Sequence, residues 1–332
     1  MKQISLTGIK PTGTPHLGNY LGAIRPALKL TKNYEPVYFI ADYHALTTVH
    51  DGQTMRENIY KVAATWLACG LNPEEGLFYK QSDIPEIFEM NWALSCFTPK
   101  GFMNRAHAYK AAVDKNVAEG ENPDSNINMG LYCYPCLMDV DILMFDANVV
   151  PVGKDQKQHV EFARDMAIRF NKHCGEQIFT VPEPLIPETV EVIPGLDGRK
   201  MSKSYDNIIN IFLPTKQLKK KIGKIVTNSQ GIDEPKDPNT CNVFRLYKLF
   251  ATEAQSEALA ARYRAGGMGW GYAKSELLNI LEEQLGPARE KYYDLLDHTE
   301  KIDKILAYGA EKARKRSREK MDKVRSVLGY SK

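Results

Sequence analysis

The stretch ISLTGIKPTGTPHLGNY, residues 4–20, decides the fold. Its first part, Ile4–Ile9, is typical of a strand, the Pro, Gly and Thr residues of 10–15 indicate a turn, and a helix is expected to start near Leu17. The N-terminus of a helix presents unpaired N–H groups and a positive dipole end, which suit a phosphate. The spacing is not that of a P-loop. On these residues alone, a capped strand-to-helix turn without a ligand stays an open alternative.

Short apolar runs and helical patterns alternate after this unit. Residues 37–41 and 77–80 are predicted strands, whereas 54–69 and 85–97 are predicted helices. Strands that alternate with helices build βαβ units on a parallel sheet, so we predict the α/β class. The polar segment 114–128 is expected to be a surface loop. After Lys203 the alternation stops and helical periodicity takes over.

Length and composition limit the class of protein. The chain has 332 residues, which predicts about two domains. With 43% hydrophobic and 26% charged residues, it has the composition of a globular protein whose core needs neither disulfides nor a structural metal. No stretch approaches about 18 consecutive apolar residues, and the N-terminus lacks the apolar core of a signal peptide, so we expect a cytoplasmic protein with no membrane segment. The six cysteines are expected to be reduced.

Charge is distributed unevenly along the chain. Residues 1–205 carry 20 Lys+Arg against 24 Asp+Glu, whereas residues 206–332 carry 24 against 17. This asymmetry indicates that only one part meets a polyanion, with a solvated lysine-rich surface as the alternative. Near the C-terminus, two stripes in steps of three and four predict an amphipathic helix with one packed and one cationic face. The packed stripe is Ala310, Ala313, Ser317, Met321, Val324 and Leu328, and the basic stripe is Lys312, Arg316, Lys320 and Lys323.

A basic loop, GRKMSKS, occupies residues 198–204. Lys200 and Lys203 lie three apart on a Gly-flanked stretch of small and flexible residues, which predicts a mobile cationic clamp. Such a loop can close on a triphosphate and neutralise the charge that moves to the leaving pyrophosphate. An ordinary basic surface loop is the alternative.

An isolated carboxylate stands in the apolar segment YPCLMDVDI, residues 134–142. Burying Asp141 there is costly unless the carboxylate has a partner. A helix cap or salt bridge is one explanation, and a single acceptor for a substrate N–H or O–H inside an apolar pocket is the other. The segment VPVGKDQKQH, residues 150–159, follows, and it is expected to open a helix that runs through Asn171. Cys133 and Cys136 lack the second pair that a zinc site needs, so we expect them to be structural.

These three segments, in this order, resemble a class I aminoacyl-tRNA synthetase. His16 and Asn19 stand at the first and last positions of a HIGH-type signature, with Asn in place of the last His. Residues 200–204 match the KMSKS signature letter for letter. The segments around Asp141 and at 151–159 are similar to bacterial tryptophanyl-tRNA synthetases, and the likeness covers nearly the whole chain.

The resemblance implies an activity and an architecture. Family members join L-tryptophan to ATP, release pyrophosphate, and transfer the tryptophanyl group to the 2′-hydroxyl of the terminal adenosine of tRNA(Trp). A doubly wound parallel sheet of the Rossmann-like kind would occupy residues 1–205. A helical anticodon-binding region would occupy 206–332, with its last helix packing back on the catalytic domain. The family is homodimeric, and Mg²⁺ would enter bound to the ATP phosphates, without a metal site on the protein.

The resemblance also implies roles for single residues. Lys200 and Lys203 would neutralise the phosphates, and Lys110 stands roughly where a family lysine reaches the triphosphate. Asp141 maps onto the indole-binding aspartate, and a buried acceptor left unpaired rejects phenylalanine strongly. The implied ATP-binding residues are Lys10, Thr12, His16, Gly18, Asn19, Gly153, Asp155, Gln156, Met201 and Ser202. The implied tryptophan-binding residues are Leu6, Met138, Asp141, Val150 and Val152 around the ring, with His44, Tyr134 and Gln156 at the amino and carboxylate end. The basic stripe Lys312, Arg316, Lys320 and Lys323 would bind tRNA.

Two positions depart from the family, and three other functions compete. Lys10 stands where many relatives have glutamine. Asp139 stands where relatives have a small residue, and it is expected to face solvent or form a salt bridge. The closest alternative is a tyrosyl-tRNA synthetase, although Met138 is a more apolar wall than the glutamine usual in archaeal-type tyrosyl enzymes. A nucleotidyltransferase that never meets RNA needs no basic half, and an RNA-binding regulator needs no intact KMSKS signature.

Overall fold

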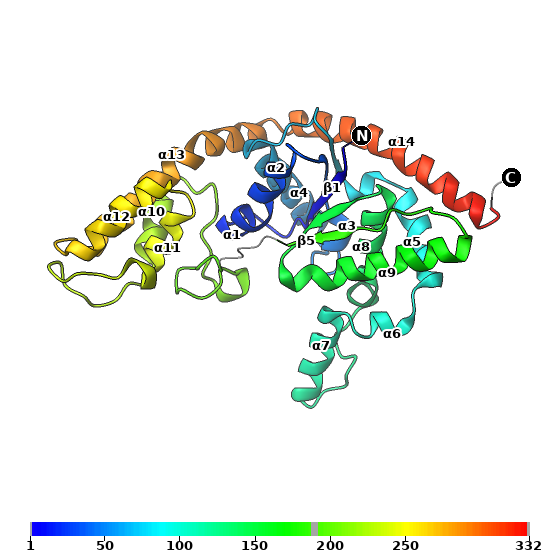
Figure 1. Ribbon diagram of the computed structural model, residues 1–332, viewed down its shortest axis with the longest axis horizontal. Helices are drawn as coiled ribbons and strands as arrows, with labels where there is room; N and C mark the ends of the chain where they lie inside the picture. Colours follow the sequence, from blue (N-terminus) through cyan, green and yellow to red (C-terminus); the bar gives the residue numbers. More distant parts are fainter. Residues whose placement is uncertain (1, 187–191, 331–332) are drawn as a thin grey trace.

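A five-stranded, wholly parallel sheet forms the centre of the molecule (Figure 1). The computed structural model describes residues 2–186 and 192–330. The strands lie in the order β3-β2-β1-β4-β5 and span Ile4–Ile9 (β1), Glu35–Ile40 (β2), Leu77–Lys80 (β3), Val149–Pro151 (β4) and Glu183–Leu185 (β5). The chain runs outward from β1 to β3 and then returns to the other side of β1. This confirms the doubly wound sheet and places the reversal of strand order between β1 and β4, where open parallel sheets bind ligands at the carboxyl ends of the strands.

Helices cover both faces of the sheet (Figure 1). The first part of the chain contains α1 (Leu17–Asn19), the π-helical turn η1 (Tyr20–Ile24), α2 (Arg25–Leu30), α3 (Asp42–Ala45), α4 (Gly52–Ala68), the 3₁₀ turn η2 (Gln81–Asp83), α5 (Glu86–Phe97), α6 (Lys100–Met103), α7 (His107–Ala118), α8 (Met129–Met144), η3 (Lys154–Gln156) and α9 (Lys157–Cys174). The rest contains η4 (Lys203–Tyr205), α10 (Thr215–Gly223), η5 (Pro238–Thr240), α11 (Asn242–Lys248), α12 (Glu253–Ala265), α13 (Trp270–Asp297) and α14 (Thr299–Val327). Across residues 2–186 and 192–330, every helix falls short of the length and apolar character that a bilayer crossing requires.

Two apolar clusters lie on opposite faces of the sheet. Successive side chains of a strand point to opposite faces, so Tyr38 of β2 belongs to one cluster and Phe39 to the other. The first cluster contains α4 and the helices after the KMSKS loop, and it joins Leu17 to Phe244 across the predicted boundary at residue 205. The second cluster contains the apolar faces of α5, α8, α9 and α14. The helical half therefore shares a core with the sheet.

The last helix lies against the outer strand β3 and continues past α5 (Figure 1). Its contact face is the predicted stripe of small residues, in which Ala313 and Ser317 are fully buried. Gly309 approaches β3 so closely that a Cβ atom there would lie 1.9 Å from the carbonyl oxygen of Phe78. Only glycine fits this contact.

The predicted loop at 114–128 is wrong in its first part, because α7 continues through Ala118. Asn116 explains the polar character of the sequence there. Its side-chain amide donates to the carbonyl oxygens of Pro123 and Ser125 at 2.9 and 2.7 Å, so it ties the returning loop to the helix. Polar residues can thus serve a helix–loop junction as well as a loop.

Candidate active site

The turn after β1 receives the second lysine of the KMSKS loop. Lys203 Nζ donates to the carbonyl oxygen of Thr12 at 2.9 Å, and a Cβ atom on Gly13 would lie 3.2 Å from that nitrogen. Gly13 has φ +112°, a backbone conformation that favours glycine. Partial burial lowers the pKa of Lys203. The two segments that the sequence analysis assigned to phosphates therefore meet at the carboxyl end of β1.

His16 closes this turn as a buried, neutral side chain. It precedes α1, and its backbone N–H donates to Asn19 Oδ1 at 3.1 Å. Burial, and then the nearby charge of Lys203, lower the pKa of His16 to about 4. The ring packs over Gly18, where a Cβ atom would lie 2.8 Å from it. The buried Nδ1 of His16 has no hydrogen-bond partner among the described residues, so it is available to a ligand.

The segment that follows the KMSKS loop returns to the same turn. Leu17 N–H donates to the carbonyl oxygen of Ile209 at 2.9 Å, and Ile211 N–H donates to that of Pro15 at 3.2 Å. These backbone bonds fix the loop relative to the turn, although nearly two hundred residues separate them in sequence. The loop is thus attached next to the place where it acts.

Asn207 organises the KMSKS loop, and the sequence analysis missed it. Its Oδ1 accepts from Ser202 N–H at 2.8 Å, and its Nδ2 donates to Asp197 Oδ1 at 2.8 Å and to the carbonyl oxygen of Lys200 at 3.1 Å. Met201 is buried, which anchors the middle of the loop and leaves Lys200 exposed. The sequence does contain an indication of this role, because Asn side chains near turns commonly form hydrogen bonds with the backbone of the adjacent loop.

Lys10 is the departure from the family at the first turn. Its Nζ donates to Thr47 Oγ1 at 3.3 Å, and burial lowers its pKa. The cation therefore lies between the turn and the segment after α3. It adds a positive group to a region that already contains Lys203.

Asp141 is the buried acceptor of the site. Only 1% of its surface is exposed. His44 Nε2 lies 2.9 Å from Oδ2, and Gln81 Nε2 donates to Oδ1 and Oδ2 at 2.8 and 2.9 Å. Burial raises the pKa of Asp141, while the hydrogen bonds from His44 and Gln81 act in the opposite direction. A carboxylate offers about four lone-pair sites. Three contacts leave one acceptor position for a ligand.

Gln81 is a second residue that the sequence analysis missed. It is fully buried at the start of η2, directly after β3. The next residue, Ser82, donates its backbone N–H to Asp42 Oδ1 at 3.0 Å, and Asp83 accepts from Arg314 Nε of α14 through its carbonyl oxygen at 2.7 Å. Three successive residues therefore bind three different elements. The sequence does indicate a site here, because the polar residues 81–83 directly follow the predicted strand 77–80, and the carboxyl ends of parallel strands are where ligands bind.

The predicted apolar contacts of the ligand belong to one cluster. Leu6 and Val150 are buried members of the second apolar cluster, and Met138 and Val152 pack against that cluster. The ring of Tyr134 lies 6.2 Å from that of His44, and its hydroxyl lies 2.9 Å from His159 Nε2. A hollow of about 450 Å³ opens beside these rings, with His44 and Tyr134 in its wall. The structure thus joins His44 to Asp141 and to Tyr134, and it places Leu6, Met138, Val150 and Val152 in or against one apolar cluster.

The expectation for Asp139 is wrong. This residue is 3% exposed, and its Oδ1 has no hydrogen-bond partner in the described part of the chain. The reason is its helix, because α8 packs against both α5 and α9, and residue 139 lies among the buried residues of α8. Burial, and then the charges of Asp165 and Asp141, raise the pKa of Asp139 well above its ordinary value. The two buried carboxyl groups of α8 thus differ in their hydrogen bonding, since within the described residues Asp141 has side-chain donors and Asp139 has none.

The remaining nucleotide-binding candidates follow β4. Gly153 precedes η3, and Gln156 ends it with its N–H donating to the carbonyl oxygen of Gly153 at 3.0 Å. Asp155 lies in η3, and its side chain is outside the described part of the structure. Lys110 is exposed on α7, which projects from the body of the molecule (Figure 1). The structure does not bring Lys110 into contact with the phosphate turn.

The predicted cationic face of α14 is wrong for Lys320, which is buried, and two further members of the stripe contact the catalytic half while staying partly exposed. Lys320 is 6% exposed and donates to Asp146 Oδ1 and to the carbonyl oxygen of Ile178, both at 2.7 Å. Arg316 pairs with Glu35, and Lys312 donates to the carbonyl oxygen of Gly76 at 3.2 Å. These long side chains lie beside the small-residue stripe, and each of them contacts the catalytic half. Among the four, Lys323 is the one that is exposed.

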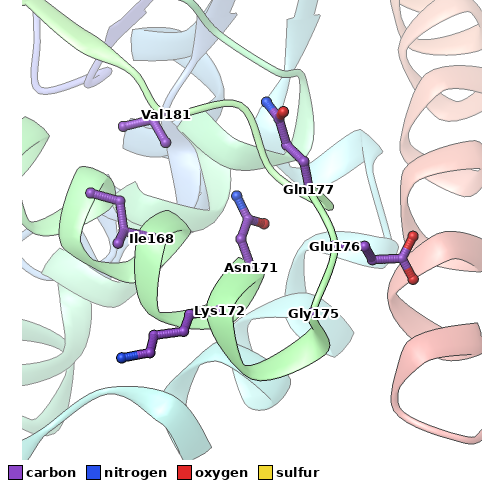
Figure 2. Close-up of a pocket in the computed structure, with 7 residues that line it drawn as sticks. All are labelled: Ile168, Asn171, Lys172, Gly175, Glu176, Gln177 and Val181. Atoms are coloured by element: carbon purple, nitrogen blue, oxygen red, sulfur yellow. The ribbon is translucent and has the colours of Figure 1, made fainter.

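A second hollow, of about 550 Å³, lies at the end of α9 (Figure 2). Asn171 in its wall is already used, because its Oδ1 accepts from the N–H groups of Ile178 and Phe179 and its Nδ2 donates to the carbonyl oxygen of Phe179. Lys172 and Glu176 are the charged residues there, and Figure 2 shows their side chains extending in opposite directions, so they do not converge on one ligand. We therefore assign the hollow no chemistry.

Fold and site together define a class I tRNA synthetase. The family described as tRNA synthetases class I (W and Y) matches residues 2–286, which include the turn, Asp141 and the KMSKS loop. Within that class, the chain belongs to the tryptophanyl-tRNA synthetase family.

The assignment to the tryptophanyl-tRNA synthetases is based on similar sequences and solved structures. The tryptophan–tRNA ligase of Pseudomonas aeruginosa is 51% identical over 328 residues, covering 98% of this chain and 73% of that protein. The ligase of Neisseria meningitidis is 50% identical over 331 residues, covering 99% and 98%. The crystal structure of the tryptophanyl-tRNA synthetase from Campylobacter jejuni, complexed with ADP and tryptophan, matches with a TM-score of 0.90 and 45% identity over 98% of this chain and all of that one.

Proposed function

We propose that this protein activates L-tryptophan with ATP and transfers it to tRNA(Trp). In the first step, an oxygen of the tryptophan carboxylate bonds to the α-phosphorus as the bond to pyrophosphate breaks. In the second, the 2′-oxygen of the terminal adenosine takes the tryptophanyl group and AMP leaves. The observation that carries the proposal is Asp141, a buried carboxylate with two protein donors, from which we infer one acceptor position left open for a ligand.

The indole explains why that open position matters. Indole has one polar group, an N–H donor, so it needs one acceptor and otherwise apolar surroundings. Phenylalanine would leave the acceptor of Asp141 unpaired, which a buried site penalises strongly. Leu6, Met138 and Val150 supply the apolar surroundings.

Activation itself needs positioning and charge neutralisation. The attacking carboxylate is already ionised, so no strong general base is required. Lys203 rests on the carbonyl oxygen of Thr12 at the phosphate turn, and Lys200 is exposed on the same loop. We propose that both bind the triphosphate of the Mg²⁺–ATP substrate and follow the charge onto pyrophosphate. The other implied nucleotide contacts, from Thr12, His16, Gly18, Asn19, Gly153, Asp155, Gln156, Met201, Ser202 and Lys110, are proposals of the same kind.

Pyrophosphate exchange tests the proposal. With ATP and labelled pyrophosphate, exchange is expected with tryptophan and not with tyrosine or phenylalanine, and tRNA(Trp) should accept tryptophan. Exchange with tyrosine instead would overturn the pocket. Asp141→Asn should lower kcat/KM for tryptophan by about ten- to a hundredfold, as expected for a hydrogen bond to a charged group, with KM for ATP unchanged.

We propose further that two copies associate through an apolar surface formed by Leu46, Phe88 and Trp92. Trp92 is 74% exposed, one helical turn after Phe88 on α5, and Leu46 and Phe88 border the same hollow. Exposed apolar patches of this kind mark interaction sites. In analytical ultracentrifugation, Trp92→Lys should lower the mass from dimer to monomer. Ile168→Lys, at an exposed apolar position on α9, is the matched control and should leave the dimer intact.

The division of labour follows the charge asymmetry. We propose that residues 1–205 bind ATP and tryptophan and that residues 206–332 bind the anticodon part of the tRNA. The second half has the positive excess that an RNA-binding region requires. Because tRNA charging takes place where translation does, we propose that the protein acts in the cytoplasm.

A further inference from the structure

Lysines dominate the exposed face of α10, together with Lys224, the residue that follows this helix. The lysines of α10 follow the helical period, and its apolar residues lie on the opposite side and are buried. We name as the α10 lysine face the residues Lys216, Lys219, Lys220, Lys221 and Lys224, all of them exposed except the half-buried Lys221. The buried side consists of Leu218, Ile222 and Ile225.

These lysines are unpaired. Within residues 2–186 and 192–330, no acidic side chain forms an ion pair with any member of the α10 lysine face, and residues 215–224 contain no Asp or Glu. Like charges three or four apart on a helix destabilise it. The helix dipole favours lysines in the last turn, but it disfavours Lys216 in the first turn. Local helix stability therefore does not explain this arrangement.

The contrast with α14 is direct. Two of the basic residues predicted to bind RNA there form ion pairs with the catalytic half, since Lys320 binds Asp146 and Arg316 binds Glu35. Further along, Arg325 binds Glu89. Lys304, Lys315 and Lys323 of α14 remain exposed, but they lie eight or more residues apart, whereas the lysines of α10 lie together within residues 216–224.

The α10 lysine face is rigidly mounted. Arg289 of α13 donates to the carbonyl oxygen of Leu213 at 3.1 Å and to Thr215 Oγ1 at 3.2 Å, which fixes the start of the helix. Lys274 of α13 donates to the carbonyl oxygen of Gly223 at 2.8 Å, which fixes its end. The segment that leads into α10 is the one bonded to the phosphate turn through Ile209 and Ile211. A partner on this face would be held at a fixed position relative to the KMSKS loop.

We infer that the α10 lysine face binds the ribose–phosphate backbone of the tRNA. Lysine ammonium groups contact phosphates as flexible point charges and read no sequence, so this face supplies affinity and orientation. It also replaces the stripe of α14 as the main cationic contact. The inference rests on the proposed function, because it takes the tRNA substrate as the polyanion.

Salt dependence of tRNA binding tests the inference. The variant Lys216→Gln, Lys219→Gln, Lys220→Gln removes three charges from the α10 lysine face. The control Lys172→Gln, Lys304→Gln, Lys315→Gln removes three exposed, unpaired charges from α9 and α14. Binding of a tRNA(Trp) transcript is measured between about 50 and 200 mM salt. Each lost phosphate contact lowers the slope of log K against log salt by about 0.7–0.9, so the α10 variant should lose about two to three from its slope and about tenfold or more in affinity.

Each outcome decides the inference. A slope equal to that of the wild type would overturn it, as would an equal loss in the control variant. A loss of tryptophan-dependent pyrophosphate exchange that parallels the loss of tRNA binding would also overturn it, because the lysines would then serve the nucleotide site. Failure of the wild type to charge tRNA(Trp) would instead refute the proposed function. Charging by the wild type with unchanged binding by the α10 variant would refute only the inference.

Discussion

Gln81→Met should weaken tryptophan activation while leaving ATP binding intact. Gln81 donates from one nitrogen to both oxygens of Asp141, and its own Oε1 accepts from His44 N–H at 3.4 Å. Methionine fills a similar volume with an apolar side chain, so the substitution removes the donor and leaves little empty space. Asp141 would then keep His44 as its only protein donor.

The size of the effect follows from those contacts. A hydrogen bond to a charged group contributes about 1.5–3 kcal/mol. If Asp141, no longer held by Gln81, loses its hydrogen bond to the indole N–H, which is a bond of this kind, kcat/KM falls by about ten- to a hundredfold, since about 1.4 kcal/mol corresponds to a factor of ten. The hydrogen bond from Gln81 lowers the pKa of Asp141, so its loss should raise that pKa further. The variant should therefore need a higher pH for full activity.

The assay is pyrophosphate exchange with separate titrations of tryptophan and ATP over a range of pH. KM for tryptophan should rise and KM for ATP should hold. Gln177→Met, at an exposed position in the hollow of Figure 2, is the matched control for the same chemical change. Unchanged kcat/KM for tryptophan and an unchanged pH profile in Gln81→Met would refute the idea that Gln81 holds the acceptor.

Three further predictions concern the buried groups. In the folded protein the raised pKa keeps a proton on Asp139, whereas the unfolded chain loses that proton above about pH 4. The free energy of unfolding should therefore fall as the pH rises above about 4. Urea unfolding of the wild type should show a lower free energy at about pH 8 than at about pH 5, and Asp139→Asn should show a smaller difference. Lys320→Met leaves Asp146 without its cation and should lower the free energy of unfolding, measured in urea, by about 2 kcal/mol. Solvent screens the half-exposed Asp146, which keeps the loss from being larger. Gly309→Ala forces α14 away from Phe78 and should lower the unfolding temperature, with a cost of about 2 kcal/mol or more. An unfolding temperature equal to that of the wild type would mean that the helix is not held at that contact.

The sequence predicted the strand–turn–helix unit and the motifs because their signals are local. Ile4–Ile9 and Leu77–Lys80 are strands with the predicted bounds, and the KMSKS loop lies at the turn beside His16. Alternation of strands and helices was enough to predict a parallel sheet, since few other arrangements bury such segments.

What the sequence did not reveal depends on contacts between distant segments. Periodicity shows that α14 has a basic stripe, but it does not show that carbonyl groups and Asp146 lie within reach of Lys320. Likewise, no local pattern distinguishes the paired Asp141 from the unpaired Asp139 two residues away, because donors from α3 and η2 make the difference. Gln81 was missed for the same reason.

The position of α14 over β3 has a consequence for how the chain is made. β3 is the outermost strand on its side of the sheet, and an uncovered edge invites pairing with strands of other molecules. During translation, every strand leaves the ribosome before the helix that covers this edge. Until α14 docks, with Gly309 against the backbone of Phe78, the nascent chain carries an open β edge. Truncations that end before Thr299 should therefore aggregate, and the last helix serves as the chain's own protection during synthesis.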